Sequence, residues 1–214
     1  MKHITLNDGT TVELKVANKD DYDCGGYEYL FAWLCQVDQF LAKQLKLEDV
    51  VDNKAQWLRN FDRNRITLLS LRKDKIIGSA TLNLNELHSR ASHVASFGIA
   101  VHPDFQRKGL GKQLIAALEQ TAHDLGIKKI EVNCYEGNQA AALYRSLNYT
   151  YEGRRLKKGR LDDGTYVDEI LFYKFLEAFS ANNRAVVAAQ MALVLQRPGS
   201  HKASQKRTCV QLAF

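Results

Sequence analysis

The 214-residue sequence has few of the features that mark low-complexity, secreted or membrane-spanning chains. It contains 2 prolines and 13 glycines, too few for a collagen-like or low-complexity protein. No apolar run approaches the ~20 residues of a transmembrane helix. The longest run, residues 185–195, is interrupted by Gln190, and the first residues lack the apolar core of a signal peptide. We therefore expect a cytoplasmic protein that has no membrane span.

The cysteines exclude a zinc site of the common kinds. None of the 4 belongs to a C-x-x-C pair or lies near a histidine at zinc spacing, so we expect no metal. A chain of this length can bury a core without disulfides, and free cysteines are often buried. We expect reduced, mostly packed thiols at these positions: Cys24, Cys35, Cys134 and Cys209.

Charge is present in only mild excess. The 30 basic and 24 acidic residues give a net charge of +6, which suits an anionic partner. A nucleic-acid binder is a third hypothesis resting on charge alone, because the interleaved aromatic and basic residues of single-strand binders are missing. The length predicts one domain with an appendage.

The order of periodic segments predicts a mixed α/β sheet. We expect strand hairpins at residues 4–6 with 12–16, 66–71 with 76–84, and 149–161 with 166–175, further strands at 94–101 and 129–135, and helices at 27–45, 54–61, 110–125 and 139–147. Asp20 and Asp21 are candidate caps for a helix that Gly25-Gly26 would interrupt, and Asn138 is a candidate cap for the last helix. The aromatic residues near the first helix would line an acceptor pocket or pack in the core: Tyr22, Tyr27, Tyr29 and Trp33.

The stretch 101–112, between a predicted strand and an amphipathic helix, has the chemistry of an anion site. The first N–H groups of a helix have no internal partner, and Gly109 and Gly111 let an anion approach the main chain. The helix dipole and the cations Arg107, Lys108 and Lys112 favour a phosphate or pyrophosphate there. An ordinary strand-to-helix turn is the alternative, because Gly-x-Gly alone is common.

Two other phosphate motifs do not fit this stretch. A P-loop requires Ser or Thr after Gly-Lys, whereas Gly111-Lys112 is followed by Gln113. A dinucleotide fingerprint would need its third glycine where the sequence has Leu114.

Two motifs resemble the GNAT superfamily of N-acetyltransferases. The first, Gln106-Arg107-Lys108-Gly109-Leu110-Gly111, resembles its acetyl-CoA pyrophosphate loop. The second, Asn138-Gln139-Ala140-Ala141-Ala142-Leu143-Tyr144 with Leu147-Asn148-Tyr149, is similar to the element that follows in that family, with Asn148 in place of the usual glycine. The resemblance is clearest over residues 94–175. It implies a GNAT-like twisted mixed sheet flanked by helices over 1–176, followed by a C-terminal helix and basic tail over 177–214.

The resemblance also implies site residues for acetyl-CoA as cosubstrate. The backbone of Ile99, Ala100 and Val101 would pair with the pantetheine arm, and Asn138 would hydrogen-bond it. The pyrophosphate would lie on the loop formed by Gln106, Arg107, Lys108, Gly109, Leu110, Gly111 and Lys112. Tyr144 would protonate the departing thiolate, which a phenol of pKa ~10 can do for a thiol of pKa ~8.5. Helix capping by Asn138 and packing of Tyr144 on the sheet are the alternatives.

The implied activity is direct attack of a primary amine on the thioester. The acceptor is left open between a small polyamine or amino acid, a protein N-terminus and a lysine side chain, and a homodimer is also left open. N-terminal acetyltransferases that this chain resembles often carry a base glutamate where it has Asn133, and Glu131 is out of alignment with that position. His93 and Glu86 flank the preceding strand, where they would relay protons or simply be solvated. No base is therefore named. A non-catalytic acyl-CoA-binding or regulatory module is the second hypothesis.

Two basic segments are expected to be solvated. The run 154–160 has the charge of a protected sheet edge, with contact to an acidic acceptor or to the coenzyme's 3′-phosphate as the alternative. The C-terminal tail carries no binding motif.

Overall fold

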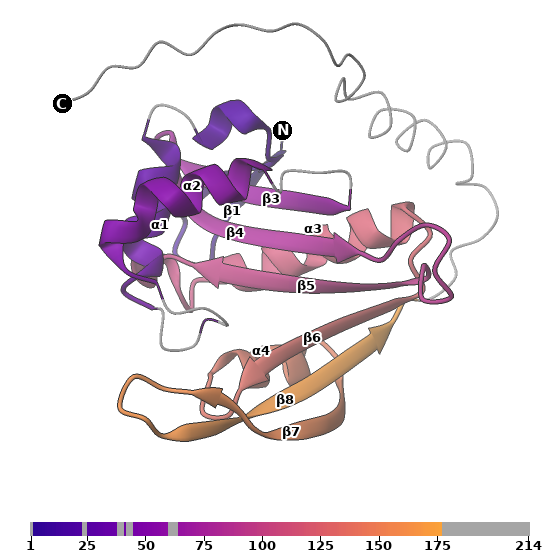
Figure 1. Ribbon diagram of the computed structural model, residues 1–214. Helices are drawn as coiled ribbons and strands as arrows, with labels where there is room; N and C mark the ends of the chain where they lie inside the picture. Colours follow the sequence, from indigo (N-terminus) through magenta and orange to yellow (C-terminus); the bar gives the residue numbers. More distant parts are fainter. Residues whose placement is uncertain (1, 23–24, 38–40, 42–44, 60–63, 177–214) are drawn as a thin grey trace, which may run out of the picture.

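The computed structural model describes residues 2–22, 25–37, 41, 45–59 and 64–176. Figure 1 shows these residues as coloured ribbons. The predicted C-terminal unit at 177–214, and with it Cys209, lies outside the described residues, as does Cys24. Of the other two cysteines, Cys134 is buried and Cys35 half-buried.

Eight strands of the described chain form one mixed sheet in the order β1-β2-β3-β4-β5-β6-β8-β7. The strands are β1 (Lys2–Thr5), β2 (Thr11–Val16), β3 (Arg65–Arg72), β4 (Lys75–Leu84), β5 (Val94–Val101), β6 (Lys129–Tyr135), β7 (Thr150–Arg160) and β8 (Tyr166–Phe175). The helices are η1 (Lys19–Tyr22), α1 (Gly26–Leu34), η3 (Leu47–Asp49), α2 (Val50–Arg59), η4 (Pro103–Phe105), α3 (Leu110–Asp124) and α4 (Ala140–Ser146). The mixed α/β class and the strand hairpins are confirmed.

The pairing of β5 with β6 is parallel and short. It comprises three residue pairs, from Val94 with Lys129 to Ser96 with Glu131. Beyond them β5 continues along β4 as far as Val101, whereas β6 continues along β8. The two strands therefore diverge, and Figure 1 shows them splaying apart from their common end.

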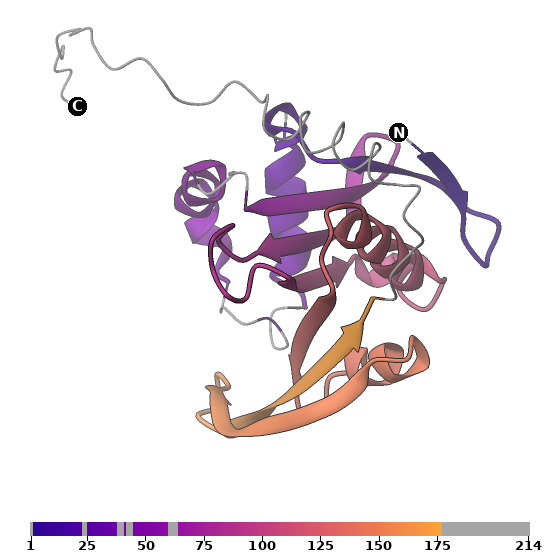
Figure 2. The same cartoon turned by 90° about the vertical axis from the view of Figure 1, so that its right-hand side faces the viewer.

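Two apolar cores lie on the two faces of the sheet. Ile77 of β4 belongs to the core covered by α3, and its neighbour Ile76 belongs to the core covered by α1. Figure 2 shows α3 and α4 on one side of the sheet and α1 on the other. The α3 side chains predicted to face the core are fully buried: Leu110, Leu114, Ile115, Leu118 and Ala122. No helix among the described residues is long and apolar enough to cross a membrane.

The first helix is shorter than its apolar spacing predicts. It ends at Leu34, where the N–H groups of Gln36 and Val37 bond to carbonyls three residues back and tighten the last turn. Residues 38–40 and 42–44 of the predicted helix lie outside the described residues. The spacing of apolar residues does not reveal where this helix ends. No glycine or proline marks the end either.

The predicted cap at Asp20 or Asp21 is also wrong. Asn18 Oδ1 accepts the Asp21 N–H at 3.0 Å, and Asp21 Oδ2 accepts the Asn18 N–H at 2.7 Å. Asn18 therefore caps η1, and Asp21 is the reciprocal acceptor of a capping box.

Asn148 ends α4 in the left-handed conformation, with φ of 63°. Its successor Tyr149 donates its N–H to the Tyr144 carbonyl at 3.0 Å, which closes the helix. Asparagine tolerates this conformation better than other residues that have a Cβ atom.

We expect Asn148→Ala to lower the free energy of unfolding by about 1 kcal/mol, because alanine is strained in the left-handed region. Asn148→Gly should cause no such loss, since glycine adopts this conformation freely. Urea denaturation of the three proteins measures the difference. Equal stability of the alanine and glycine variants would contradict the assigned cap.

Candidate coenzyme and acceptor site

The gap between β5 and β6 leaves one edge of β5 open. From Phe97 to Val101 this edge pairs with no strand of the described chain, because β6 pairs with β5 only up to Ser96. Unpaired main-chain groups at such an edge can hydrogen-bond an extended ligand as though it were another strand.

The hydrogen-bond alternation of the β4–β5 ladder decides which residues present their main chain to the gap. His102 donates its N–H to Ile77 of β4 at 2.9 Å, and residues in an antiparallel ladder alternate between paired and outward-facing. The main chain of Ala100 therefore points toward β4, whereas that of Ile99 and Val101 points into the gap. Of the three residues predicted to bind the pantetheine arm, Ala100 is therefore the one whose main chain does not face a ligand in the gap.

Gln106 fixes the end of this edge. Its Nε2 donates to the Val101 carbonyl at 3.1 Å, so this side chain orders the junction between β5 and the following loop. The Ile99 N–H and C=O and the Val101 N–H stay available to a ligand arm.

The loop before α3 has an unusual backbone that exposes its amides. Arg107 and Gly109 both have positive φ, of 57° and 88°. Within the described residues the N–H groups of residues 107–112 have no main-chain acceptor. Successive free amides at a helix N-terminus can bind an anion, and the pyrophosphate site stays a prediction for this stretch.

The hairpin turn between β1 and β2 supports this loop. The Asn7 N–H donates to the Lys108 carbonyl at 3.0 Å, and the Asn7 side chain lies against Gly109. Asp8 pairs with the Lys108 ammonium at 3.0 Å, which lowers the pKa of Asp8 to about 2. Lys108 also lies over the Phe105 ring at 5.5 Å. Its charge is therefore partly engaged, which leaves Arg107 and Lys112 as the more available cations of the predicted set.

Gly111 brings the loop, the β5 edge and α4 together. A Cβ atom at Gly111 would lie 3.3 Å from Leu143 of α4, 3.9 Å from Val101 and 4.0 Å from Ile99. The two sequence motifs, separated along the chain by α3 and β6, therefore meet at one place. This is the close approach for which glycine is needed.

Asn138 is used in capping. Its Oδ1 accepts the Ala140 N–H at 2.8 Å at the start of α4. Its side chain is part-buried, and its Nδ2 has no hydrogen-bond partner among the described residues.

Tyr144 lies in an aromatic cluster on the α4 side of the gap. Its ring meets Phe97 of β5 and Phe172 of β8 edge-on, each at 5.8 Å between centroids. It is 3% exposed, and this burial raises the pKa of its hydroxyl. The hydroxyl has no hydrogen-bond partner within the described chain. Tyr144 therefore packs on the sheet, and its phenol stays protonated at neutral pH.

The opposite face of the gap carries a polar cluster that sequence reasoning missed. Asn133 of β6 donates its Nδ2 to Glu169 of β8, and Arg155 of β7 pairs with Glu169 at 2.6 Å. The sequence alone drew attention only to Asn133 and to the basic run 154–160, which contains Arg155. No motif marks Glu169, because strand pairing alone brings it to Asn133.

The other polar candidates lie near the closed end of the gap. Glu86 and His93 belong to the β4–β5 connection, and Glu131 is in the last pair before the strands part. Glu131 pairs with Lys129 at 2.7 Å. Of the predicted pocket aromatics, Tyr22, Tyr27 and Trp33 are buried in the α1 core, and Tyr29 stacks on His102 at 5.9 Å.

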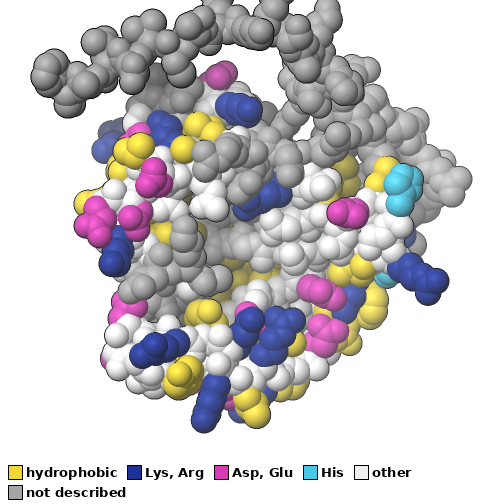
Figure 3. All heavy atoms as spheres, in the orientation of Figure 1, with side chains coloured by type: hydrophobic (Ala, Val, Ile, Leu, Met, Phe, Trp, Pro, Cys, Tyr) yellow, Lys and Arg dark blue, Asp and Glu magenta, His cyan; other side chains and the backbone are white. Residues whose placement is uncertain are grey.

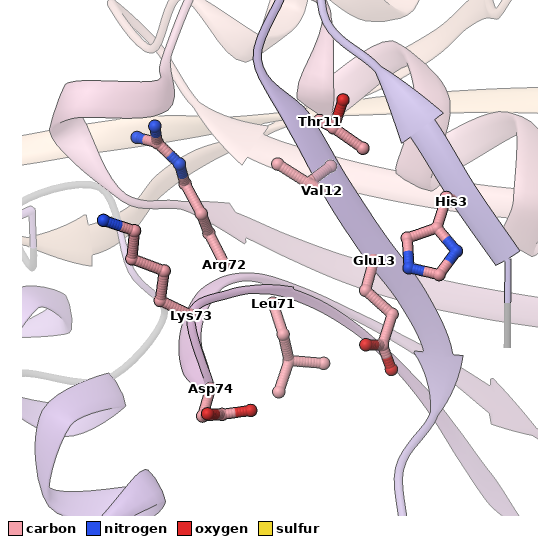
Figure 4. A pocket seen from close by; sticks show the side chains of 8 residues that line it. All are labelled: His3, Thr11, Val12, Glu13, Leu71, Arg72, Lys73 and Asp74. Atoms are coloured by element: carbon pink, nitrogen blue, oxygen red, sulfur yellow. The ribbon is translucent and has the colours of Figure 1, made fainter.

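A separate hollow of about 310 Å³ lies between the β1–β2 strands and the β3–β4 hairpin (Figure 4). It is lined by His3, Thr11, Val12, Glu13, Leu71, Arg72, Lys73 and Asp74. None of these is a predicted site residue. Figure 3 shows a further depression between the two parts of the molecule that the splayed strands separate.

A sheet split at a parallel strand pair, with unpaired main-chain amides at the helix start beside the split, can hold an extended ligand that carries an anionic group. The acetyltransferase (GNAT) family model matches residues 28–149, and the chain belongs to this family of acetyltransferases. The family generally uses acetyl-CoA as its cosubstrate. The free amides of residues 107–112 and the open β5 edge fit that molecule.

Individual relatives support the assignment. The chain is 30% identical over 95 residues to glucosamine 6-phosphate N-acetyltransferase of Schizosaccharomyces pombe, covering 44% of this chain and 84% of that protein. It is also 30% identical over 95 residues to an L-amino acid N-acetyltransferase of Escherichia coli, and the match covers 44% of this chain and 57% of that protein. Among solved structures, smu.2055 of Streptococcus mutans superposes with a TM-score of 0.65 at 26% identity, covering 77% of this chain and 99% of that one.

We expect Gly109→Ala to weaken CoA binding about tenfold, which corresponds to 1.4 kcal/mol. Its φ of 88° strains alanine, and the new Cβ atom would meet Asn7 at 3.0 Å and displace the loop. Titration calorimetry with CoA measures the affinity.

Gly126→Ala is the matched control. Gly126 has a similar φ of 81° at the far end of α3, with open space around a Cβ atom. It should lose a similar amount of stability and keep its affinity for CoA. Equal affinity of the two variants would argue against the loop as the diphosphate site.

Proposed function

We propose that this protein transfers the acetyl group of acetyl-CoA to a primary amine by direct attack of the amine on the thioester. The observation that carries the proposal is the meeting of the loop, the β5 edge and α4 at Gly111. One extended ligand can contact all three there.

The geometry supports one direction for the coenzyme. Its diphosphate would accept hydrogen bonds from the amides of residues 107–112 at the open end of the gap. Its pantetheine arm would pair with Ile99 and Val101 and run toward the closed end. The thioester then lies near Phe97 and Gly98, and Asn138 Nδ2 would hydrogen-bond the arm.

Tyr144 is suited to act as the acid. It packs against Phe97, beside the proposed thioester position, and its phenol is protonated at neutral pH, so it carries the proton that the sulfur needs. When the amine nitrogen bonds to the carbonyl carbon, the C–S bond breaks and the sulfur takes the Tyr144 proton. The phenolate recovers a proton from solvent, and the nitrogen loses one to solvent. Because the phenol stays protonated, we expect no alkaline loss of activity from this group below about pH 10.

The acceptor is proposed to enter from the α1 side of the gap. The two curated relatives are named for glucosamine 6-phosphate and for L-amino acids, each a small amine that also carries an anionic group. A panel of these compounds, an alanine-initiated peptide and a lysine-containing peptide tests the proposal by CoA thiol release. Release above thioester hydrolysis with at least one amine is expected. Binding of acetyl-CoA without release for any amine would favour the non-catalytic module.

We expect Tyr144→Phe to lower kcat on the order of 100-fold while CoA affinity stays unchanged, because only the acid is removed. The measurement is steady-state thiol release with the fastest acceptor of the panel.

Tyr149→Phe provides the comparison. Tyr149 lies 5.9 Å from Tyr144 between ring centroids, and its hydroxyl donates to Glu119 at 2.9 Å. This variant should lose stability and retain kcat. An unchanged kcat in Tyr144→Phe would remove the acid role.

A further inference from the structure

The cluster of Asn133, Glu169 and Arg155 lies on three neighbouring strands of the sheet face opposite α4. Glu169 is buried, with 6% of its surface exposed, whereas Asn133 is exposed. The Glu169 carboxylate accepts one bond from Asn133 Nδ2 and one from Arg155 at 2.6 Å. A buried carboxylate with two charge-compatible donors is a well-ordered group.

This arrangement fixes the orientation of the Asn133 amide. An ionised carboxylate only accepts hydrogen bonds, so the group that Asn133 turns toward Glu169 must be its NH₂. The other end of the amide, the Oδ1 acceptor, therefore points away from Glu169. Asn133 is an exposed residue, so a ligand can approach its side chain.

The strand register places Asn133 across the gap from Gly98. The last parallel pairs join Ala95 with Ile130 and Ser96 with Glu131. Continued by two residues, the same register sets Gly98 opposite Asn133 on the same face. A Cβ atom at Gly98 would meet nothing within 4 Å, so the space above it is open. Asn133 thus stands beside the proposed thioester position, on the side opposite Tyr144.

The charge of the cluster also suits a reactive amine. Arg155 neutralises Glu169, so the group presented to the gap is a neutral oxygen. A bare carboxylate there would stabilise the ammonium form, which has no lone pair for attack.

We propose that Asn133 binds the acceptor amine. Its Oδ1 accepts one N–H and directs the nitrogen lone pair at the carbonyl carbon beside Gly98. Glu169 and Arg155 are positioning residues that hold the Asn133 amide in this orientation. Asn133 takes no proton, and the proton that the nitrogen loses goes to water. The inference rests on the proposed acetyl transfer and names the acceptor-binding group of that site.

The first test is Glu169→Gln, assayed with glucosamine 6-phosphate, an L-amino acid and the two peptides. Glutamine offers a donor as well as an acceptor, so the Asn133 amide is no longer held in one orientation. We expect the KM of the amine to rise about tenfold, the effect of one lost or misdirected hydrogen bond, with CoA affinity unchanged. Asp168→Asn is the matched control, because Asp168 is the next carboxylate on β8, faces the other side and pairs with Arg154 at 3.0 Å. It should leave the KM unchanged.

A second measurement separates positioning from a general structural role. Asn133→Leu should raise the amine KM to a similar extent, and the double variant should be no worse than Asn133→Leu alone, because Glu169 acts through Asn133. The fall of kcat/KM at low pH (its acid limb) should keep the same midpoint in Glu169→Gln, because this fall reports protonation of the acceptor amine and not of Glu169.

Additive effects in the double variant, an unchanged KM in either single variant, or loss of the acid limb in Glu169→Gln would overturn the inference. The last result would make Glu169 a base. Retained CoA binding shows that each variant is folded. Failure of the wild-type protein to acetylate any panel amine would instead be a failure of the proposed function.

Discussion

The site depends on a main-chain constraint, the parting of β5 and β6 after three parallel pairs. Beyond Ser96 each strand keeps its other neighbour, so the sheet stays intact while one edge of β5 faces a gap in the middle of the fold. Main-chain N–H and C=O groups require partners, and an extended ligand arm supplies them as a strand would. In the proposed complex the coenzyme would complete the hydrogen bonding of the sheet, at a position set by the strand register.

The remaining parts of the site are arranged around that gap. At its open end, the loop before α3 keeps its amides free because two residues adopt left-handed conformations, and the β1–β2 turn holds this backbone through Asn7 and Asp8. On one side of the gap α4 brings Tyr144 against Phe97. On the other side the Arg155–Glu169 pair orders Asn133. Acid and acceptor-binding group thus approach the proposed thioester from opposite faces of the sheet.

Much of the fold could be predicted from local patterns. The alternation of β6 predicted burial of Ile130, Val132 and Cys134, and all three are buried. Helix α3 begins where the loop motif ends and stops before Gly126, which has the expected left-handed conformation. The end of α1 was wrong, because its last turn is closed by main-chain bonds that apolar spacing does not record.

The sequence alone determined the glycine-containing loop before α3, the start of α4 and the mixed sheet, because glycine positions and apolar periodicity act within a few residues of chain. It could not show that Ala100 turns its main chain to β4, that Lys108 pairs with Asp8, or that Glu169 orders Asn133. Those relations join residues up to 100 positions apart, counted from Lys108 to Asp8. They arise from strand register and from the packing of one turn on another. Only the tertiary structure decides such contacts, since a shift of one residue in register turns every side chain of a strand to the other face.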